Sequence, residues 1–392
     1  MKLEALKKMF EGIFPLEQRP QLFFSPGRVN LIGEHIDYNG GAVFPAAITF
    51  GTYGAITPRE DRKVCLYSGN FKECGVIEFD LDDLSRSQDE HWTIYVKAVI
   101  SQFIKAGYEI KKGFNGYIEG NIPNGAGLSS SASLELLIAQ ILQELNDLEL
   151  NMIEKVKLSQ KAENEYVGVQ CGIMDQFAIG MGKKDYAIKL NTNDLSYEYA
   201  LANLQDCSIL IMNTNKKRQL ADSKYNERRA ECEQALTLLQ TQKEIEYLCD
   251  LTPTEFEIVG AAILKDNTLY RRARHAITEN NRVQLAVKAL ANEDLAQFGN
   301  LLNESHRSLR DDYEVTGREL DTIVELAWQQ PGVIGARMTG AGFGGCALAI
   351  VKNHELVNVQ EQIAQNYKAQ IGYDAHFYVA SIGDGTKTLT NC

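Results

Sequence analysis

The sequence predicts an α+β protein of two domains, and three observations lead to this prediction. At 392 residues the chain is longer than one hydrophobic core ordinarily organises. Hydrophobic residues make up 44% of the chain and charged residues 23%, as is usual for globular proteins. Segments with strand patterning alternate with segments of helical spacing, and this pattern restarts near residues 200–206. We therefore expect one domain over residues 1–205 and a second over residues 206–392.

The N-terminal part of the chain is predicted to be rich in strands. A short amphipathic helix over residues 3–10 precedes QLFFSPGRVNLIGEH, a strand that opens into a turn at Pro26-Gly27. Apolar or β-branched runs bounded by glycine and proline predict further strands at 42–48, 52–57, 64–67 and 76–79. Helical spacing follows over residues 92–106.

A long helix is predicted after the strand at residues 116–119. Its apolar residues recur at the spacing of one buried helix face: Leu134, Leu137, Ile138, Ile141, Leu142 and Leu145. A second helix covers about residues 153–166, and GIMDQFAIG begins a third.

The second half of the chain begins with the strand CSILIMNT at Cys207. Helices are then expected near 223–239, 269–290, 294–309 and 320–328. A strand-like GARM, a glycine-rich turn at 340–345, the strand CALAIVK, a helix near 354–369 and the strand HFYVA complete the chain.

Charge and cysteine usage argue against several classes of function. A net charge of −12 argues against nucleic acid or an anionic membrane as a partner. The eight cysteines contain no Cys-x-x-Cys pair, which predicts neither a disulfide framework nor a zinc site. The first residues, MKLEALKKMFEGIF, lack the apolar stretch of a secretory signal, and no run approaches the roughly 18 apolar residues that span a bilayer. We expect a cytoplasmic protein without an obligate protein partner.

The segment GNIPNGAGLSSSASLELL has the features of a phosphate-binding loop. Gly125 and Gly127 let the backbone approach an anion, and the dipole of the following helix favours a phosphate at its N-terminus. The serines between residues 129 and 133 add hydroxyl groups. It is not a Walker A loop, which requires a lysine; candidates for that charge are Lys216, Lys217, Arg218 and Arg228. Taken alone, the segment is explained equally well as a glycine turn before a serine-capped helix.

Charged residues and glycines are concentrated in GRVNLIGEHIDYNGG, residues 27–41. Glu34 and Asp37 can accept hydrogen bonds from the hydroxyls of a sugar-like ligand, and His35 can accept or donate. A charged surface turn with a structural histidine is the alternative. A second glycine-rich run, MTGAGFGGCALAIV, contains GxGxxG but opens a strand rather than a helix, so we reject dinucleotide binding.

Two carboxylates are candidates for the chemistry. Asp175 lies among apolar neighbours in GIMDQFAIG, where a charge is costly unless it is paired. Glu163 lies earlier, on a predicted helix. Mg²⁺ takes oxygen ligands, often only one or two of them from the protein. For Glu163 the alternative is a solvated charge on a helix surface.

Together, five segments resemble the galactokinases of the GHMP kinase superfamily. SPGRVNLIGEHIDYNGG resembles the family's signature, GNIPNGAGLSSSASLE its ATP loop and GARMTGAGFGGC its C-terminal glycine motif. CGIMDQF and SKYNERR are similar to two further segments, and all five occur in the expected order over nearly the whole chain. The signature is the most specific of them, and it departs from the family at Ile36, where threonine is usual.

The resemblance implies a fold and an activity. It implies an N-terminal domain like ribosomal protein S5 domain 2 and a ferredoxin-like C-terminal domain, with the active site in the cleft between them. It also implies transfer of the γ-phosphoryl group from ATP, with Mg²⁺, to the anomeric hydroxyl of galactose.

The resemblance assigns roles to individual residues. Asp175 would be the catalytic base, and Arg28 would offset the reacting charge. Ser131 and Glu163 would hold Mg²⁺. The sugar would contact Glu34, His35, Ile36, Asp37, Gly172 and Tyr225. The nucleotide would contact Ser68, Gly125, Ala126, Gly127, Leu128, Ser129, Ser130 and Ser131.

Three alternatives remain open. The first is a kinase for N-acetylgalactosamine or another sugar, and the second is a non-catalytic galactose sensor. The presence of Ser131 and Ala132 in the loop, with Asp175 and Arg28, favours an enzyme over a sensor. The third, a bare ATP-binding module, has no need for the polar cluster at 28–41.

Overall fold

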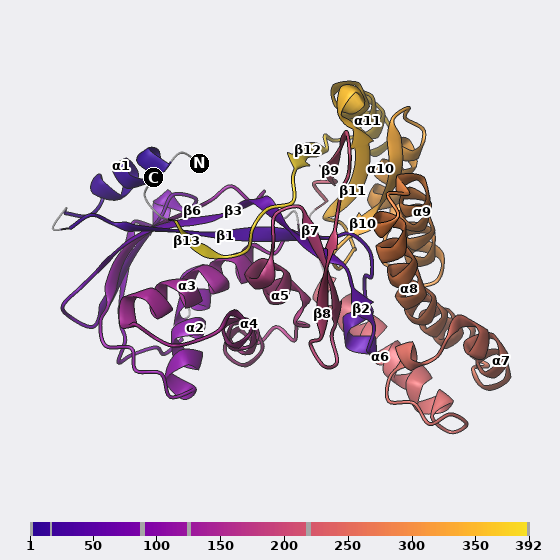
Figure 1. The fold of residues 1–392 in the computed structure, drawn as a ribbon, viewed down its shortest axis with the longest axis horizontal. Helices are drawn as coiled ribbons and strands as arrows, with labels where there is room; N and C mark the ends of the chain where they lie inside the picture. Colours follow the sequence, from indigo (N-terminus) through magenta and orange to yellow (C-terminus); the bar gives the residue numbers. More distant parts are fainter. Residues whose placement is uncertain (1–2, 16–17, 87–90, 124–126, 217–220, 390–392) are drawn as a thin grey trace.

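The computed structural model describes residues 3–15, 18–86, 91–123, 127–216 and 221–389 (Figure 1). Within these ranges the strands form sheets of six, four and three strands. The six-stranded sheet is built mainly from the first half of the chain, and the four-stranded sheet from the second. Figure 1 shows the two sheets at opposite sides of the molecule.

The six-stranded sheet has the order β13-β1-β3-β6-β4-β5 among the described residues. Neighbouring strands are antiparallel except β4 and β6, which are parallel. Figure 1 shows α2 to α5 below the sheet and α1 above it. These elements are β1 Gln21–Asn30, β3 Pro45–Pro58, β4 Lys63–Ser68, β5 Val76–Asp80, β6 Phe114–Gly120, β13 Lys387–Leu389, α1 Leu3–Glu11, α2 Thr93–Lys105, α3 Ser130–Asn146, α4 Met152–Lys161 and α5 Met174–Met181.

The four-stranded sheet is antiparallel, in the order β10-β11-β9-β12. This is the strand order of a ferredoxin-like βαββαβ unit, with helices between β9 and β10 and between β11 and β12. Its elements are β9 Cys207–Asn213, β10 Val333–Thr339, β11 Cys346–Lys352, β12 His376–Ala380, α6 Ala221–Leu239, α7 Pro253–Ile263, α8 Asn267–Ala291, α9 Leu295–Asp311, α10 Arg318–Trp328 and α11 Leu356–Ile371. The small third sheet consists of β2 Ala42–Val43, β7 Tyr186–Asn191 and β8 Tyr197–Leu201.

The predicted turn at Pro26-Gly27 is wrong. β1 runs continuously through both residues, with a β-bulge in its pairing with β3 between Pro26 and Arg28. A bulge tolerates proline, which has no N–H for the ladder. Gly27 is needed for a close approach, because a side chain there would lie 2.7 Å from the carbonyl oxygen of Leu128. After the bulge the amide of Arg28 donates to that same carbonyl at 3.2 Å, so the bulge brings Arg28 to the loop before α3.

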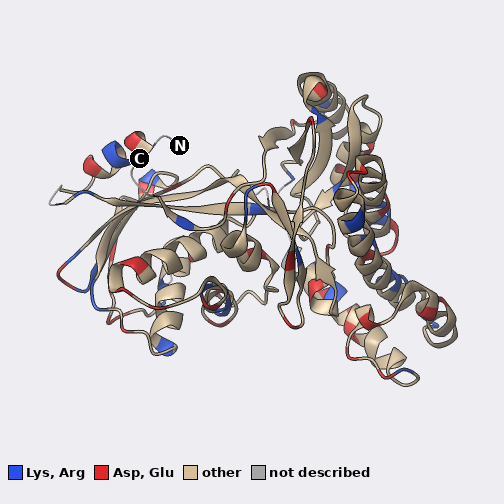
Figure 2. Ribbon diagram, viewed as in Figure 1, with Lys and Arg blue, Asp and Glu red and all other residues tan. Residues whose placement is uncertain are grey.

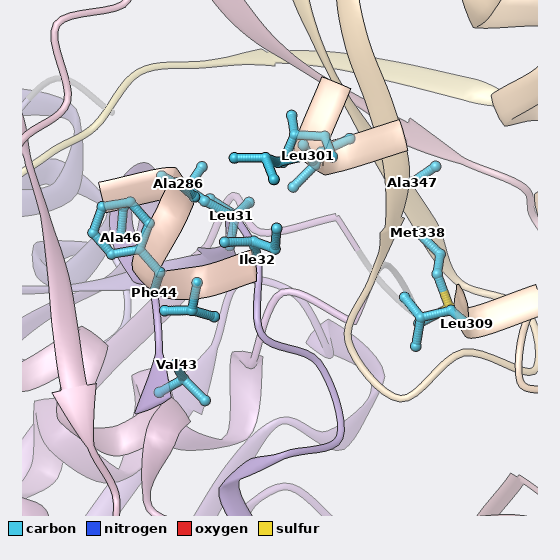
Figure 3. Close-up of a cluster of buried hydrophobic side chains, with 14 of the residues drawn as sticks. Leu31, Ile32, Val43, Phe44, Ala46, Ala286, Leu301, Leu309, Met338 and Ala347 are labelled. Atoms are coloured by element: carbon cyan, nitrogen blue, oxygen red, sulfur yellow. The ribbon is translucent and has the colours of Figure 1, made fainter. Parts of the chain in front are cut away.

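The largest hydrophobic cluster joins the two halves of the chain. Figure 3 shows side chains from the segment after β1 in one cluster with side chains of α8, α9, β10 and β11. Its labelled members include Leu31, Phe44, Ala286, Leu301 and Met338, all buried. The division at 205/206 stays a prediction: the second sheet begins with β9 at Cys207, yet the core is shared and β13 returns to the first sheet.

Charge is spread over the molecule without a segregated basic region. Figure 2 shows acidic and basic residues interspersed along both halves of the ribbon. Among the described residues, no helix has both the length and the apolar character that crossing a membrane requires.

Candidate active site

A cavity of about 710 Å³ lies where the two halves of the chain meet. Residues from the signature, the segment before α5, the start of α6 and the second glycine-rich turn line it: Arg28, Gly33, Glu34, His35, Asp37, Glu163, Gly168, Val169, Gln170, Cys171, Gly172, Met174, Asp175, Tyr225, Asn226, Gly340 and Ala341. The structure thus brings together residues that are more than 300 positions apart in the sequence.

A bidentate ion pair between Arg28 and Asp175 forms the centre of the site. Arg28 Nε and Nη2 donate to the two carboxylate oxygens of Asp175, each at 2.8 Å, and Nη1 donates to the carbonyl of Gly127 at 2.8 Å. This fork geometry is the strongest form of carboxylate pairing. The Arg28 side chain is 6% exposed but that of Asp175 is 29% exposed, so the carboxylate keeps an open side toward the cavity.

The loop before α3 is fixed to this ion pair. Ser129, in the left-handed backbone region at φ 61°, donates its hydroxyl to Asp175 Oδ2 at 2.5 Å. Asp175 itself lies in the first turn of α5, where the helix dipole favours a negative charge. Gly127 has φ 69°, which a residue with a side chain rarely adopts. The ion pair, the loop and two helix N-termini therefore form one polar unit.

The other predicted loop residues have different surroundings. Gly125 and Ala126 lie outside the described residues. Leu128 is buried and contributes its carbonyl to Arg28 N, whereas Ser130 is exposed at the start of α3. Ser133 is a structural residue: it is fully buried and donates to the Ser25 carbonyl at 2.8 Å.

Glu163 is a buried carboxylate at the cavity, so the alternative of a solvated surface charge is wrong. It is 8% exposed and lies in a π-helical turn over Ala162–Val167, where the predicted helix departs from regular α-geometry. The hydroxyl of Ser131 hydrogen-bonds to Glu163, and Gln176 Nε2 donates to it at 2.8 Å. Burial, reinforced by the charge of Asp175, raises the pKa of Glu163.

A second buried carboxylate, Glu135, stands beside Glu163. Gln176 Nε2 bridges the two, with a 3.0 Å bond to Glu135 Oε2, while Glu135 Oε1 is buried without a hydrogen-bond partner. Burial and the neighbouring Glu163 raise the pKa of Glu135 well above its usual value. Two buried carboxylates with an orphaned oxygen have the electrostatics of a site that receives a cation.

Glu34 is fixed by the second half of the chain. Its Oε1 accepts from Arg337 Nη1 at 3.3 Å, Thr339 Oγ1 at 3.1 Å and the amide of Gly340 at 2.8 Å, and its Oε2 accepts from Asn30 at 2.9 Å. Glu34 and Arg337 are both almost fully buried. The alternative of a charged surface turn is therefore wrong for this residue.

His35 and Ile36 differ in where their side chains lie. The ring of His35 lines the cavity, and burial lowers its pKa to about 3, so the ring is neutral near pH 7. Ile36 is fully buried, and its side chain packs so closely on Gly41 that a side chain there would come within 2.8 Å. The expectation that Ile36 contacts the ligand is corrected for its side chain, because an apolar group at this position belongs to the core.

Asp37 and Gly172 face one another at the cavity. A side chain on Gly172 would lie 2.0 Å from Asp37 Oδ2, so only glycine fits there. Burial, with the charges of Asp175 and Glu34, raises the pKa of Asp37 to about 6. The ring of Tyr225 lies 5.5 Å from that of His35 and 5.6 Å from that of Tyr38.

Some predicted residues are not brought into this cavity. Ser68 is buried at the end of β4, where its hydroxyl accepts from the amide of Asn70 at 3.2 Å, and its contact with nucleotide stays a prediction. Lys216 is paired with Glu319 at 2.7 Å, and Arg228 with Glu231 at 2.7 Å. Neither pair points to a replacement for the Walker lysine. Lys217 and Arg218 lie outside the described residues.

Sequence reasoning missed several residues that shape the site: Glu135, Cys171, Gln176, Glu279 and Arg337. The fully buried Glu279 accepts from the amide of Gly33 at 3.0 Å. Glu135 could have been suspected, because a glutamate follows the buried Leu134 on the face of α3 that packs inward. Arg337 could have been suspected for the same reason, because it lies within the apolar strand GARM. Nothing in the sequence signals that Glu279 reaches Gly33, because that contact depends on the tertiary fold.

Comparison with known proteins identifies the family of the chain. Residues 8–58 match the galactokinase galactose-binding signature, residues 94–183 the GHMP kinases N terminal domain and residues 286–369 the GHMP kinases C terminal domain. The chain is 57% identical to a galactokinase of Clostridium perfringens over 389 residues, covering 99% of this chain and 100% of that protein. It is 54% identical to the galactokinase of Lactiplantibacillus plantarum over 390 residues, again covering 99% and 100%.

Solved structures give the same result at the level of the fold. The crystal structure of Lactococcus lactis galactokinase complexed with galactose is similar with a TM-score of 0.95 and 53% identity, covering 99% of this chain and 100% of that one. Mevalonate kinase of Methanococcus jannaschii, 19% identical, shares the fold with a TM-score of 0.66, covering 94% of this chain and 100% of that one. The α+β architecture is that of the GHMP kinases, and the chain belongs to the galactokinase family within them.

Proposed function

We propose that this protein transfers the γ-phosphoryl group of ATP to the anomeric hydroxyl of galactose, giving galactose 1-phosphate and ADP. The observation that carries this proposal is the Arg28–Asp175 pair, whose carboxylate opens toward a cavity lined by the signature residues. Membership in the galactokinase family and the galactose-bound relative support the choice of sugar.

Asp175 acts as the base or orients the acceptor hydroxyl. Its carboxylate is held in one plane by Arg28 and Ser129, and its remaining lone pairs are free to accept the proton of a sugar hydroxyl. Phosphoryl transfer proceeds through a loose transition state, so positioning and charge supply most of the catalysis. Arg28, fixed by Gly127 and Asp175, offsets negative charge that develops between acceptor and phosphate.

The nucleotide binds at the loop before α3. The backbone of Gly127 to Ser131, the first turn of α3 and its dipole suit the phosphates, as do Gly125 and Ala126 by family resemblance. The loop has its own support, because Gly127 and Leu128 are both hydrogen-bonded to Arg28. Ser68 is proposed as a weaker contact to the nucleotide.

Mg²⁺ fits the oxygen donors that the structure presents. Ser131 is hydrogen-bonded to Glu163, which lines the cavity, and Glu135 adds a buried oxygen without a partner. Mg²⁺ is often held by only one or two protein ligands together with nucleotide phosphates. When bound, Mg²⁺ would offset phosphate charge.

Galactose is proposed to contact Glu34, His35, Asp37, Gly172 and Tyr225, and Ile36 through its main chain only. Glu34 and Asp37 are acceptors for sugar hydroxyls. Tyr225 supplies an aromatic wall, and Gly172 leaves room for Asp37 beside the sugar. We also propose a cytoplasmic location, which the seven described cysteines support, because all of them are free thiols.

The test is formation of galactose 1-phosphate by the purified chain with MgATP and galactose. A substrate panel that includes N-acetylgalactosamine and glucose separates the sugar kinases from each other. Robust turnover of the N-acetyl sugar without turnover of galactose would overturn the assignment. Galactose binding with no turnover at all would instead favour the sensor.

A further inference from the structure

A chain of hydrogen-bonded side chains runs from α6 to the cavity. His35 Nε2 lies 3.1 Å from the carbonyl oxygen of Ala341, and His35 Nδ1 lies 2.8 Å from the hydroxyl of Tyr38. That hydroxyl lies 2.8 Å from the hydroxyl of Tyr313, which in turn lies 3.1 Å from Sγ of Cys232. Tyr313 and Cys232 are buried, whereas Tyr38 is partly exposed and the buried His35 lines the cavity. The chain connects the signature, α6, the segment after α9 and the second glycine-rich turn.

One end of the chain fixes the direction of every hydrogen bond in it. A carbonyl can only accept, so His35 Nε2 carries a proton and donates it to Ala341. The ring is neutral, so His35 Nδ1 is an acceptor and Tyr38 must donate to it. Because Tyr38 has a single proton, Tyr313 donates to Tyr38. The thiol of Cys232 then donates to Tyr313.

Both ring nitrogens of His35 are therefore engaged by protein groups. The Ala341 carbonyl belongs to the second glycine-rich turn. Ala341 and its neighbour Gly340 both line the cavity. The rings of His35 and Tyr38 both pack against the ring of Tyr225. His35 therefore contacts both Ala341 and Tyr225, which line the cavity.

We propose that Tyr38 is a positioning residue for galactose, because its hydroxyl holds His35 in the Nε2–H tautomer that fixes Ala341 and Tyr225. The identity of the sugar rests on the proposed function. The tautomer does not, since it follows from contacts within the protein.

Loss of the Tyr38 hydroxyl leaves no good arrangement for His35. If the ring keeps its tautomer, Nδ1 becomes a buried acceptor without a donor, which is costly. If the proton moves to Nδ1, the lone pair of Nε2 faces the lone pairs of the Ala341 carbonyl. In both cases the contact between the signature and the glycine-rich turn weakens.

The experiment compares Tyr38→Phe with Tyr313→Phe, which both keep an aromatic ring in place. Tyr38→Phe is expected to raise the KM for galactose about tenfold and to change kcat by less than about twofold. Tyr313→Phe leaves the Tyr38 donor to His35 in place, so its KM is expected to change by less than about threefold. Tyr53→Phe, a hydroxyl outside the cavity lining, is the control.

The direct readout is the protonation of His35, followed by ¹⁵N NMR of histidine-labelled protein without ligands. The native protein and Tyr313→Phe are expected to show the neutral Nε2–H form, and Tyr38→Phe to lose it. An Nδ1–H or doubly protonated His35 in the native protein would overturn the proposal, as would an unchanged galactose KM in Tyr38→Phe. Absence of galactose turnover in the native protein would instead contradict the proposed function and leave the NMR result standing.

Discussion

At the scale of single residues, the site depends on how Asp175 is held. Three hydrogen bonds, from Arg28 Nε, Arg28 Nη2 and Ser129, occupy one side of its carboxylate. The other side faces the cavity, so the group is rigid and still available to a ligand. Rigid support of a reacting group from neighbouring residues is what transfer of a phosphoryl group requires.

Asp175→Asn is expected to lower kcat by about three orders of magnitude, because an amide cannot take the proton of the acceptor hydroxyl. Galactose binding, measured by calorimetry, is expected to change only a few-fold, since the amide oxygen still accepts a hydrogen bond. Thermal unfolding of the variant checks that the loss of the Arg28 partner has not disrupted the fold. Turnover near that of the native enzyme would remove Asp175 from the proposed role.

The raised pKa of Asp37 predicts the acid limb of the pH profile of kcat/KM for galactose. Its pKa is raised to about 6, so the carboxylate is ionised at pH 7 and becomes protonated as the pH falls through 6. If the ionised form accepts from the sugar, kcat/KM for galactose falls about tenfold per pH unit below pH 6. Because Glu163 also has a raised pKa, the profile is to be measured at saturating MgATP. Asp37→Asn is expected to have low kcat/KM without this acid limb.

Neutralising the Asp37 carboxylate is expected to raise the free energy of unfolding. Its pKa in the folded state lies above the unfolded value of 3.8, so the folded protein binds more protons between about pH 4 and 6. The free energy of unfolding therefore decreases as the pH rises through this window. Asp37→Asn is expected to melt at a higher temperature than the native protein at pH 7, and the difference should vanish below pH 4. A lower melting temperature at pH 7 would contradict the raised pKa.

At the scale of elements, the periodicity of apolar residues predicted the helices that pack one face against the core. The helix at 269–290 is α8, Asn267–Ala291, and the helix at 320–328 is α10, Arg318–Trp328. The strands at 42–48 and 52–57 are instead mostly one long strand, β3, because Gly51 and Gly54 are accommodated in the sheet rather than turning the chain. A side chain on Gly51 would lie 2.4 Å from Phe24, so this glycine is needed for strand packing.

Elements without a periodic signal were missed. α7, β7, β8 and β13 have short or mixed patterns, and their partners lie elsewhere in the chain. The same limit applies to the site. The carboxylates Glu34, Asp37, Glu163 and Asp175 were identified from the sequence, whereas Glu135 and Glu279 were not. The pairing of Glu34 with Arg337 and of Glu163 with Gln176 depends on the tertiary fold. Resemblance supplied the roles of Arg28 and Asp175, and the β-bulge at Pro26 that brings them together was predicted as a turn.

The contact between α9 and β10 is the element-scale interaction on which the Glu34 side of the site depends. β10 is an edge strand, and two of its amides donate to side chains of α9. The amide of Ala336 donates to Asn303 Oδ1 at 2.9 Å, and the amide of Met338 donates to His306 Nδ1 at 3.2 Å. These bonds cap an edge that would otherwise be open. The helix can approach so closely only because Gly299 faces the strand.

Gly299→Ala is expected to destabilise the protein by about 2–3 kcal/mol, because the new methyl group would lie 2.1 Å from the carbonyl oxygen of Ile334. The displaced β10 carries Arg337, so the KM for galactose should rise as well. Chemical denaturation and steady-state kinetics test the two effects. Gly12→Ala is the matched control, since its nearest neighbour would be 3.5 Å away. Equal stability of the two variants would show that α9 can move aside.

At the scale of the whole molecule, the two halves are held together twice. The shared core joins the signature to α8, α9 and β10 (Figure 3). The end of the chain then crosses back to the first sheet, where β13 pairs with β1 at Leu22, Phe23 and Phe24. The cavity therefore lies between two halves that share a core and a sheet.

The returning segment supports both members of the catalytic pair. Thr386 Oγ1 lies 2.8 Å from Ser25 Oγ on β1, three residues before Arg28. The amides of Thr386 and Gly385 donate to the carbonyls of Ile179 at 2.9 Å and Gly182 at 2.8 Å, at the C-terminal end of α5, the helix whose first turn contains Asp175. The segment that leads into β13 therefore links β1 to α5.

Deletion of residues 384–392 is accordingly expected to loosen the catalytic pair, although none of the described residues in this range, 384–389, lines the cavity. Hydrogen exchange should become faster in β1 and α5, where backbone and hydroxyl partners are lost, and stay unchanged in β9 and β11 of the other sheet. kcat is expected to fall more than galactose affinity, because Arg28 and Asp175 lose their shared support while the bonds that fix Glu34 remain. Thr386→Val, which removes only the bonds of one hydroxyl, should give a smaller change in the same direction. Unchanged exchange in β1 and α5 after the deletion would show that the ion pair itself, rather than the returning strand, holds the two elements together.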